Sequence, residues 1–476
     1  MARWARRLKS RSRRTERLQS DSRPAAARSQ TAGQATTPRT ASYDRAVDAP
    51  ISLSPIELAA ARKRARRSLI AGVALGSTGH IAAVTVATIV AQDLLGDPTF
   101  AGAPGATVVL GAAIGSILLS SLMTRRGRRI GLVTGYSVGV IGALIATSAV
   151  ILRSFPLLLV GTLLIGFGNS SNQLSRYTAA DLVPATRRAS AIGLVVWGAT
   201  VGSVVGPTLV PVSSAMARSF GLPPLAGPYL VPVFFVGIAA LLSFVLLRPD
   251  PYTIADTSSP EPRAARISGS PTEALGSMLR RPGVTAAIVA LVVGQFVMTL
   301  IMTMTPLHMT QHGHDLGAVG LVLSAHTLGM FALSPLSGRL AERVGAVRAI
   351  FTGTTVLALS AVLAAVAPPR GGDLLLVALF LLGLGWNIGF VAGSALLSEH
   401  LEVHERTRVQ GFADAVIWSA AAAASLGSGV IMAGAGYTAL GVLGTGLVLI
   451  PVLTLRAHRQ ALAHRHEAPD RATLLP

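Results

Sequence analysis

The stretch SGRLAERVG, Ser337 to Gly345, places two arginines and a glutamate between two long apolar runs. Only 13% of the chain's 476 residues are charged, so three charges within nine residues stand out. Short charged stretches of this kind are typical of the connections between membrane-spanning segments. The length of the neighbouring apolar runs therefore decides the fold.

Apolar runs of about 20 residues, enough for a helix to cross a hydrocarbon core of roughly 30 Å, recur along the chain. We identify twelve: 68–92, 104–123, 130–152, 155–175, 190–212, 228–248, 283–305, 316–337, 347–367, 374–397, 411–433 and 436–455. Backbone groups in a bilayer must be hydrogen-bonded within the protein, and these runs are too long and too continuously apolar for barrel strands. The sequence predicts an all-α membrane protein with twelve transmembrane helices.

Several classes of function are excluded by what the sequence does not contain. There is no cysteine, and hence no disulfide, thiolate metal site or thiol nucleophile. No Gly-x4-Gly-Lys-Ser/Thr loop for ATP occurs, and no span carries a Ser-His-Asp, His-Glu-x-x-His or paired-carboxylate arrangement. We expect neither an enzyme nor a cofactor. We also expect no metal site, since His458, His464 and His466 lie among arginines in a solvated or membrane-surface tail.

The distribution of arginine predicts the orientation. Loops that follow even-numbered spans are basic, whereas the other loops hold only Arg153, Arg218 and Arg370. The basic loops contain Arg125, Arg126, Arg128, Arg129, Arg187, Arg188, Arg248, Arg263, Arg266, Arg280, Arg281, Arg339, Arg343, Arg348, Arg406 and Arg408. By the positive-inside rule both termini are cytoplasmic, in a plasma membrane or bacterial inner membrane.

The remaining segments are predicted from composition. Residues 1–67 carry 17 basic and five acidic residues, cannot bury a core, and form a disordered cytoplasmic tail. This tail either only retains the N-terminus inside, contacts anionic lipid headgroups, or binds nucleic acid; we favour retention with lipid contact. Two six-helix halves, 68–248 and 283–457, flank a cytoplasmic linker at 249–282 that is rich in Pro, Ser and Gly. Residues 458–476 form a cytoplasmic C-terminal tail.

The two halves are copies of each other. Residues 120–129, SSLMTRRGRR, lie where the opening stretch lies in the second half, at a constant offset of 218 residues. The same offset relates six pairs: Gly127 and Gly345, Gly111 and Gly329, Gly135 and Gly353, Asp181 and Glu399, Arg188 and Arg406, and Gly193 and Gly411. A duplication with an even number of spans gives two copies of one orientation, for which alternating access at their interface is the natural mechanism.

These residues resemble the major facilitator superfamily of secondary transporters. GRLAERVG (338–345) closely matches its loop signature Gly-x-Leu-Ala-(Asp/Glu)-Arg-x-Gly-(Arg/Lys)-(Arg/Lys), and SSLMTRRGRR is a degenerate copy. In the first copy Ser120 replaces the first glycine and Thr124 the acid; the second copy ends in Ala346 and Val347 instead of basic residues. The resemblance covers roughly 68–457 and implies two pseudo-symmetric six-helix halves.

The signature also suggests a gate at the cytoplasmic side. Gly338 and Gly345 permit a tight turn, Arg343 can meet acids at neighbouring helix ends, and Glu342 favours the positive end of a facing helix. Such contacts form when this side is closed and break when it opens. The gating residues we predict are Arg125, Gly127, Arg128, Asp181, Gly338, Glu342, Arg343, Gly345, Glu399 and Asp414.

Asp414, near the start of span 11, is the hypothetical substitute for the acid missing at Thr124. We expect it to pair with Arg125 or Arg128, with Asp181 as a further partner of Arg128. The alternative is that Asp414 complements only the N-terminus of its own helix.

Span 5 contains Gly193-x8-Gly202-x3-Gly206-Pro207, which resembles the superfamily's antiporter signature without its final two glycines. Gly198, Gly202 and Gly206 share one face and let another helix approach closely. In the family this helix packs across the two halves. The alternative is that such spacing is common in any glycine-rich membrane helix.

In this family spans 1, 4, 7 and 10 line the central cavity, and polar residues at membrane depth usually face a cavity or a partner helix. We predict a cavity lined by His80, Asn169, Asn172, Gln173, Gln295, Thr299, Trp386 and Asn387. For each amide the alternative is a helix–helix hydrogen bond. His80 and His326 are the mid-span histidines that could take up a proton.

We therefore expect a monomeric secondary transporter that exports a small, largely apolar molecule in exchange for protons, with anionic lipids at its tail and no nucleic acid partner. An importer of a small metabolite is the alternative, because one fold serves both directions. A sensor or scaffold that no longer transports is a third hypothesis.

Overall fold

The computed structural model describes residues 54–96, 100, 102–256, 276, 279–314, 316–368 and 372–456. Residues 1–53 of the predicted N-terminal tail, most of the central linker and the chain from residue 457 lie outside these ranges. Residues 55–67, predicted to belong to the disordered tail, are instead helical and form the start of the helix Pro55–Leu95. The described residues form helices and connecting turns, with no β-strand among them.

The helices of the described residues form two halves. The first half contains α3 (Pro55–Leu95), α4 (Ala103–Arg126), α5 (Arg128–Ile151), α6 (Phe155–Asp181), α7 (Arg188–Ser219) and α8 (Gly227–Leu246). A short helix, α9 (Pro251–Asp256), follows α8. The second half contains α11 (Pro282–Gln311), α12 (Leu316–Phe331), α13 (Ser334–Val344), α14 (Ala346–Val366), α15 (Gly372–Glu399) and α16 (Val403–Leu447).

The predicted twelve spans are present in the described residues. Nine helices there are long and apolar enough to cross a membrane, and α12 and α13, bent by 40°, together make a tenth span. The 27-residue α6 is a further span, whose polar residues are mostly buried against its neighbours. The backbone of α16 breaks at Gly436, where φ is 78°, so the apolar helical stretch Glu405–Arg456 contains two spans.

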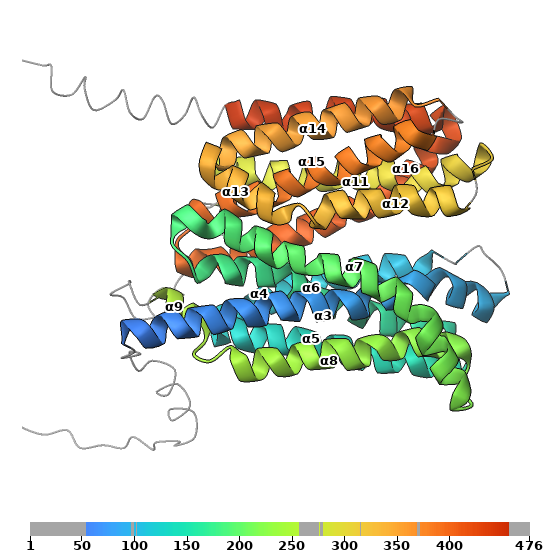
Figure 1. Ribbon diagram of the computed structural model, residues 1–476, viewed down its shortest axis with the longest axis horizontal. Helices are drawn as coiled ribbons and strands as arrows, with labels where there is room; N and C mark the ends of the chain where they lie inside the picture. The colour runs from blue at the N-terminus through green and yellow to red at the C-terminus, as the bar shows by residue number, and fades with distance from the viewer. Residues whose placement is uncertain are drawn as a thin grey trace, which may run out of the picture. The chain divides into compact units, whose positions relative to one another are not determined.

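Within the first half α5 and α4 pack on α6, and α3 packs on α7 and α8. The second half repeats this pattern, with α14 and α12 packing on α15, and α11 packing on α16 (Figure 1). Between the halves, α7 contacts α13 and α4 contacts α16. These two contacts are equivalent under the 218-residue offset.

Glycines bring the two halves together at both contacts. The backbone at Gly193 of α7 lies against Ser334 and Gly338 of α13, and a side-chain carbon there would collide with the Ser334 carbonyl oxygen. Gly411 of α16 lies equally close to Ser120 of α4. Gly338 therefore serves close helix packing, whereas Gly345, with φ of 88°, makes the turn that only glycine readily adopts.

Candidate functional site

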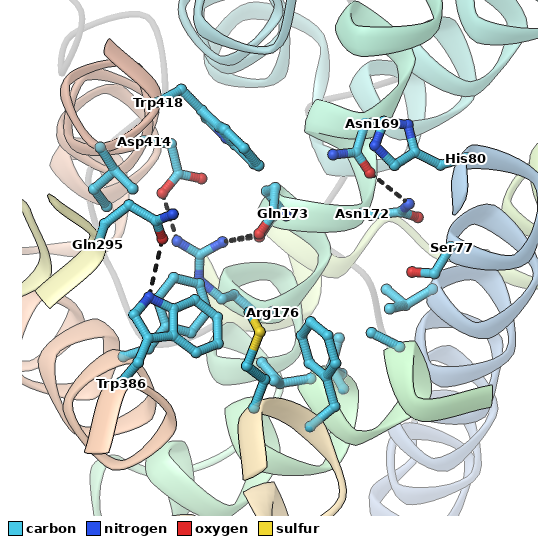
Figure 2. A pocket seen from close by; sticks show the side chains of 18 of the residues that line it. Ser77, His80, Asn169, Asn172, Gln173, Arg176, Gln295, Trp386, Asp414 and Trp418 are labelled. Carbon is cyan, nitrogen blue, oxygen red and sulfur yellow. Dashed lines mark hydrogen bonds and ion pairs between the residues drawn. The ribbon is translucent and has the colours of Figure 1, made fainter. Parts of the chain in front are cut away.

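A cavity of about 200 Å³ lies between the two halves. Its walls come from α3, α6 and α7 of the first half and from α11, α12, α15 and α16 of the second (Figure 2). Six of the eight residues predicted for the cavity line it: His80, Asn169, Asn172, Gln173, Gln295 and Trp386.

The other two predicted residues lie behind the wall. Thr299 accepts a hydrogen bond from Gln295 Nε2 over 3.2 Å. Asn387 is fully buried and binds Ser334 and Ser337, each over 2.5 Å. Its amide therefore connects α15 to α13, which is the helix–helix hydrogen bond considered as the alternative for each amide.

One side of the cavity is aromatic. The rings of Trp386 and Phe390 stack with centroids 4.5 Å apart, and Phe331 meets Trp386 edge-on at 6.1 Å. The Trp386 indole Nε1 donates to Gln295 Oε1 over 2.9 Å, which fixes the orientation of the ring. Trp418 of α16 also lines the cavity.

The opposite side is polar and uncharged. Tyr136 donates its hydroxyl proton to Asn172 Oδ1 over 3.0 Å, and Asn172 Nδ2 donates to Asn169 Oδ1 over 2.9 Å. His80 lies beside Asn169 in Figure 2. Its Nδ1 is buried and has no hydrogen-bond partner among the described residues, so this nitrogen can bind a ligand.

An ion pair joins the halves at the cavity wall. Arg176 of α6 and Asp414 of α16 are 2.5 Å apart, and their side chains are 2% and 1% exposed. Arg176 also donates to Ser394, its equivalent at the 218-residue offset, over 3.2 Å. Its guanidinium lies over the rings of Tyr177 and Phe390 at 4.2 and 4.3 Å.

This pair corrects the sequence-based prediction for Asp414. We expected Arg125 or Arg128 as its partner, but Arg125 is exposed and Arg128 binds elsewhere. Asp414 lies three turns inside α16, so it does not complement the N-terminus of that helix either. Arg176 was not among the predicted site residues, although it lies on the same polar face of span 4 as Asn169 and Asn172.

A second set of charges closes the basic side, which we define as the face with the loops 127, 182–187, 345 and 400–402. Arg128 is fully buried and donates to Asp181 over 2.7 Å and to Gln410 of the other half over 2.8 Å. Arg406 donates to Asp181 from the second half over 3.4 Å. Asp181 is therefore the partner of Arg128, as expected, and it bridges both halves.

The stretch from Ser337 to Gly345 also contributes to closing the basic side. Glu342 accepts a hydrogen bond from the backbone N–H of Ser190, in the first turn of α7, over 2.9 Å. A carboxylate at a helix N-terminus is stabilised by the helix dipole. Arg343 and Glu399, also predicted as gating residues, are exposed.

Next to this side, Arg281 precedes α11 and donates two hydrogen bonds of 2.8 Å to the Glu405 carboxylate. These bonds raise the pKa of Arg281. The pair connects the start of α11 to the start of α16 within the second half.

The glycine face of α7 packs differently from the expectation. Gly198, Gly202 and Gly206 lie against α3 of the same half, with Ser77 and Thr78 facing Gly202. In the antiporter-like motif, the atoms nearest to Gly193 belong to the other half, those nearest to Gly202 and Gly206 belong to α3, and Pro207 is exposed. The motif thus lets α7 and α3 pack closely beside the cavity.

The described residues contain no group of three or more His, Cys, Asp and Glu side chains that could hold a metal ion. The cavity is lined by polar, aromatic and aliphatic side chains. It combines a flat aromatic surface, several amides and one embedded carboxylate that is neutralised by an arginine.

Comparison with known proteins gives a consistent result. The family model of the Major Facilitator Superfamily matches residues 68–318 and 298–475. An uncharacterized MFS-type transporter, YdeG of Bacillus subtilis (strain 168), is 40% identical over 386 residues, covering 79% of this chain and 88% of YdeG. The riboflavin transporter RfnT of Brucella anthropi is 31% identical over 403 residues, covering 82% of this chain and 96% of RfnT.

Solved structures show the same fold at lower identity. The MFS transporter FucP, in its outward conformation, aligns with a TM-score of 0.69 at 16% identity and covers 83% of this chain and 98% of its own. At this identity the similarity concerns the fold alone.

Proposed function

The chain belongs to the Major Facilitator Superfamily, and we propose that it carries a small, planar aromatic molecule through the cavity between its halves by alternating access. The observation that carries this proposal is the aromatic wall of Trp386 and Phe390 facing a row of amides. Aromatic pairs contribute about 0.5–1.5 kcal/mol beyond their buried area. A flat ring with hydrogen-bonding edges therefore fits this cavity better than an aliphatic chain or a sugar.

The relatives support this class of substrate. RfnT is a riboflavin transporter, and riboflavin has a flat ring system with amide-like edges. Gln295 offers a hydrogen-bonding group beside the aromatic wall, and Asn169 and Asn172 offer others on the opposite side of the cavity. Riboflavin is thus the first probe to use, whereas the sequence alone suggested only a largely apolar molecule.

We further propose that protons drive the transport through Asp414. A proton on this carboxylate removes the attraction to Arg176, because the neutral acid no longer balances the guanidinium. The contact between α6 and α16 then weakens and the basic side opens. Loss of the proton restores the pair and closes that side, so protonation and conformation change together.

Export is the direction that the antiporter-like pattern of α7 favours. In export a proton enters from the side opposite the basic face, opens the basic side, and is exchanged there for substrate. Uptake is the second candidate, because the same protonation step can admit a proton and a substrate together. Both directions use the same cavity and the same ion pair.

Binding of riboflavin to the purified protein tests the cavity directly. Stacking on an indole quenches flavin fluorescence, so a titration reports affinity. Trp386→Ala should weaken binding about two- to tenfold, since one aromatic pair is lost. Trp197→Ala is the matched control, because Trp197 is 40% exposed on α7 and does not line the cavity.

The outcomes are distinct. Equal affinity of the wild type and Trp386→Ala would overturn the aromatic wall as the binding surface. A wild type that does not bind riboflavin would exclude flavins, and the titration would then be repeated with other planar heteroaromatic molecules.

A further inference from the structure

The chain immediately after α8 folds back against the start of α5. The carboxylate of Asp250 accepts three backbone hydrogen bonds there. Arg128 N donates to Oδ1 over 3.1 Å, Arg129 N donates to Oδ2 over 2.9 Å, and Tyr252 N donates to Oδ1 over 2.8 Å. Asp250 therefore caps the first two residues of α5 from a position 122 residues further along the chain.

The turn between α4 and α5 is shaped to receive this carboxylate. Gly127 has φ of 94°, a conformation that side chains rarely adopt. A side-chain carbon at Gly127 would also collide with the carboxylate of Asp250. Glycine is thus required at this position by the turn and by the approach of Asp250.

Apolar packing holds the segment in place. Tyr252 and Ile254, which follow Asp250, are both buried. Ile254 belongs to the same apolar cluster as Ala61 and Ala65 in the first turns of α3. Arg64 of α3 also donates a hydrogen bond to the Arg248 carbonyl oxygen. The short helix α9 at the end of this segment contacts α3, α5 and α6, so the segment is fixed on three helices of the first half.

Asp250 holds the backbone of a gating residue. The Arg128 side chain reaches Asp181 in its own half and Gln410 in the other half. In the second half the signature acid Glu342 supplies a helix-capping contact, to Ser190 N. In the first half its equivalent is Thr124, an uncharged residue.

We propose that Asp250 is a positioning residue of the transport cycle: by capping α5 it fixes Arg128, and it thereby supplies from the linker the acid that the first loop copy lacks. The start of the linker then belongs to the gate. Losing the cap lets the first turn of α5 fray, so Arg128 no longer holds Asp181 and Gln410 together. The basic side then spends more time open.

This inference rests on the contacts of Asp250 and on family membership, and it is independent of substrate, coupling ion and direction. The absence of cysteine makes it straightforward to test. Arg126 and Arg348 are exposed and lie on opposite halves of the basic side. Spin labels attached to Arg126→Cys and Arg348→Cys therefore report the opening of the basic side as an increase in the distance between them.

Asp250→Ala and Asp250→Asn are introduced into this labelled protein. Glu57→Gln is the matched control, because Glu57 also caps a helix, binding Ser54 at the start of α3, but does not contact the gate. We expect the ratio of the closed to the open population, read from the distance distribution, to fall about fivefold for Asp250→Ala, as for the loss of one helix cap. Asp250→Asn should give a smaller fall, and Glu57→Gln no change.

A coupling test separates positioning from general stability. If Asp250 acts through Arg128, adding Asp250→Ala to Arg128→Gln should not change the ratio of closed to open populations any further. An additive shift in the double variant, or unchanged distances in both folded Asp250 variants, would overturn the proposal. Should Asp250→Ala fail to fold, Asp250→Asn gives the answer by the same measurement.

Discussion

Arg176 and Asp414 lie 238 residues apart in the sequence and form a buried ion pair of 2.5 Å between the two halves. The pair lies in the wall of the cavity (Figure 2), whereas Arg128, Asp181 and Arg406 form a separate network that does not line it. Two charged contacts at different depths therefore close the basic side. The deeper one is within reach of a bound molecule, so it can connect substrate or proton binding to opening.

Removing one partner of this ion pair should lower the free energy of unfolding. Asp414→Asn leaves Arg176 buried without its counter-charge, and Arg176→Gln does the same to Asp414. Each single variant should lose about 3–5 kcal/mol of stability, whereas the double variant should recover much of that loss, since no charge stays unpaired. Unfolding of the purified proteins in detergent, arranged as a double-mutant cycle, measures this.

The exposed pair of Arg153 and Asp93, with side chains 64% and 48% exposed, is the control for that cycle. Its single variants should change stability by less than about 1 kcal/mol. Additive losses in the Arg176 and Asp414 double variant would show that the two side chains do not interact as the structure indicates.

Glu342 should bias the gate without being needed for folding. Glu342→Ala removes the acceptor for Ser190 N from the positive end of α7, so the closed state of the basic side should lose about 0.3–1 kcal/mol, a roughly two- to fivefold shift. Distances between the labels at 126 and 348 measure the shift. Glu399 is an exposed acid that corresponds to Asp181 under the 218-residue offset. Glu399→Ala is the control and should leave the distances between the labels unchanged.

The glycine face of α7 predicts a packing defect. A side chain at Gly206 meets the Thr78 oxygen and Ile81 of α3 at 3.0 Å, so Gly206→Leu should cost roughly 1–3 kcal/mol and reduce transport. At Gly237 of α8 the nearest atom is 4.0 Å away, and Gly237→Leu should be tolerated. Thermal unfolding and flux of the two variants test this; equal effects would exclude close α3–α7 packing as the reason for the glycine.

Much of the fold could be predicted from the sequence, because apolar length and arginine placement are local properties. The duplication added the relation between the halves, and the contact of Glu342 with a helix N-terminus followed from the charge of its carboxylate. The break at Gly436 agrees with the predicted short connection between the last two spans. These features need no knowledge of distant partners.

The site was harder to predict, because its contacts join residues that share no sequence pattern. Asp414 lies opposite Arg176, but nothing in the spacing selects Arg176 over Arg128. Asn387 resembles the cavity amides in sequence, yet its side chain binds Ser334 and Ser337. Asp250 belongs to no sequence motif. Its role becomes evident only from the structure, in which the segment after α8 packs beside Gly127.

The most direct test of the proposed function is flux of riboflavin in everted membrane vesicles with an imposed pH gradient. Proton-driven export predicts accumulation when the lumen is acidic, abolished in Asp414→Asn and in the double variant with Arg176→Gln, and retained in Trp197→Ala. Accumulation only in right-side-out vesicles with an acidic exterior would select uptake instead. No movement of riboflavin or of other planar aromatic molecules under any gradient, with folded wild-type protein, would contradict the account.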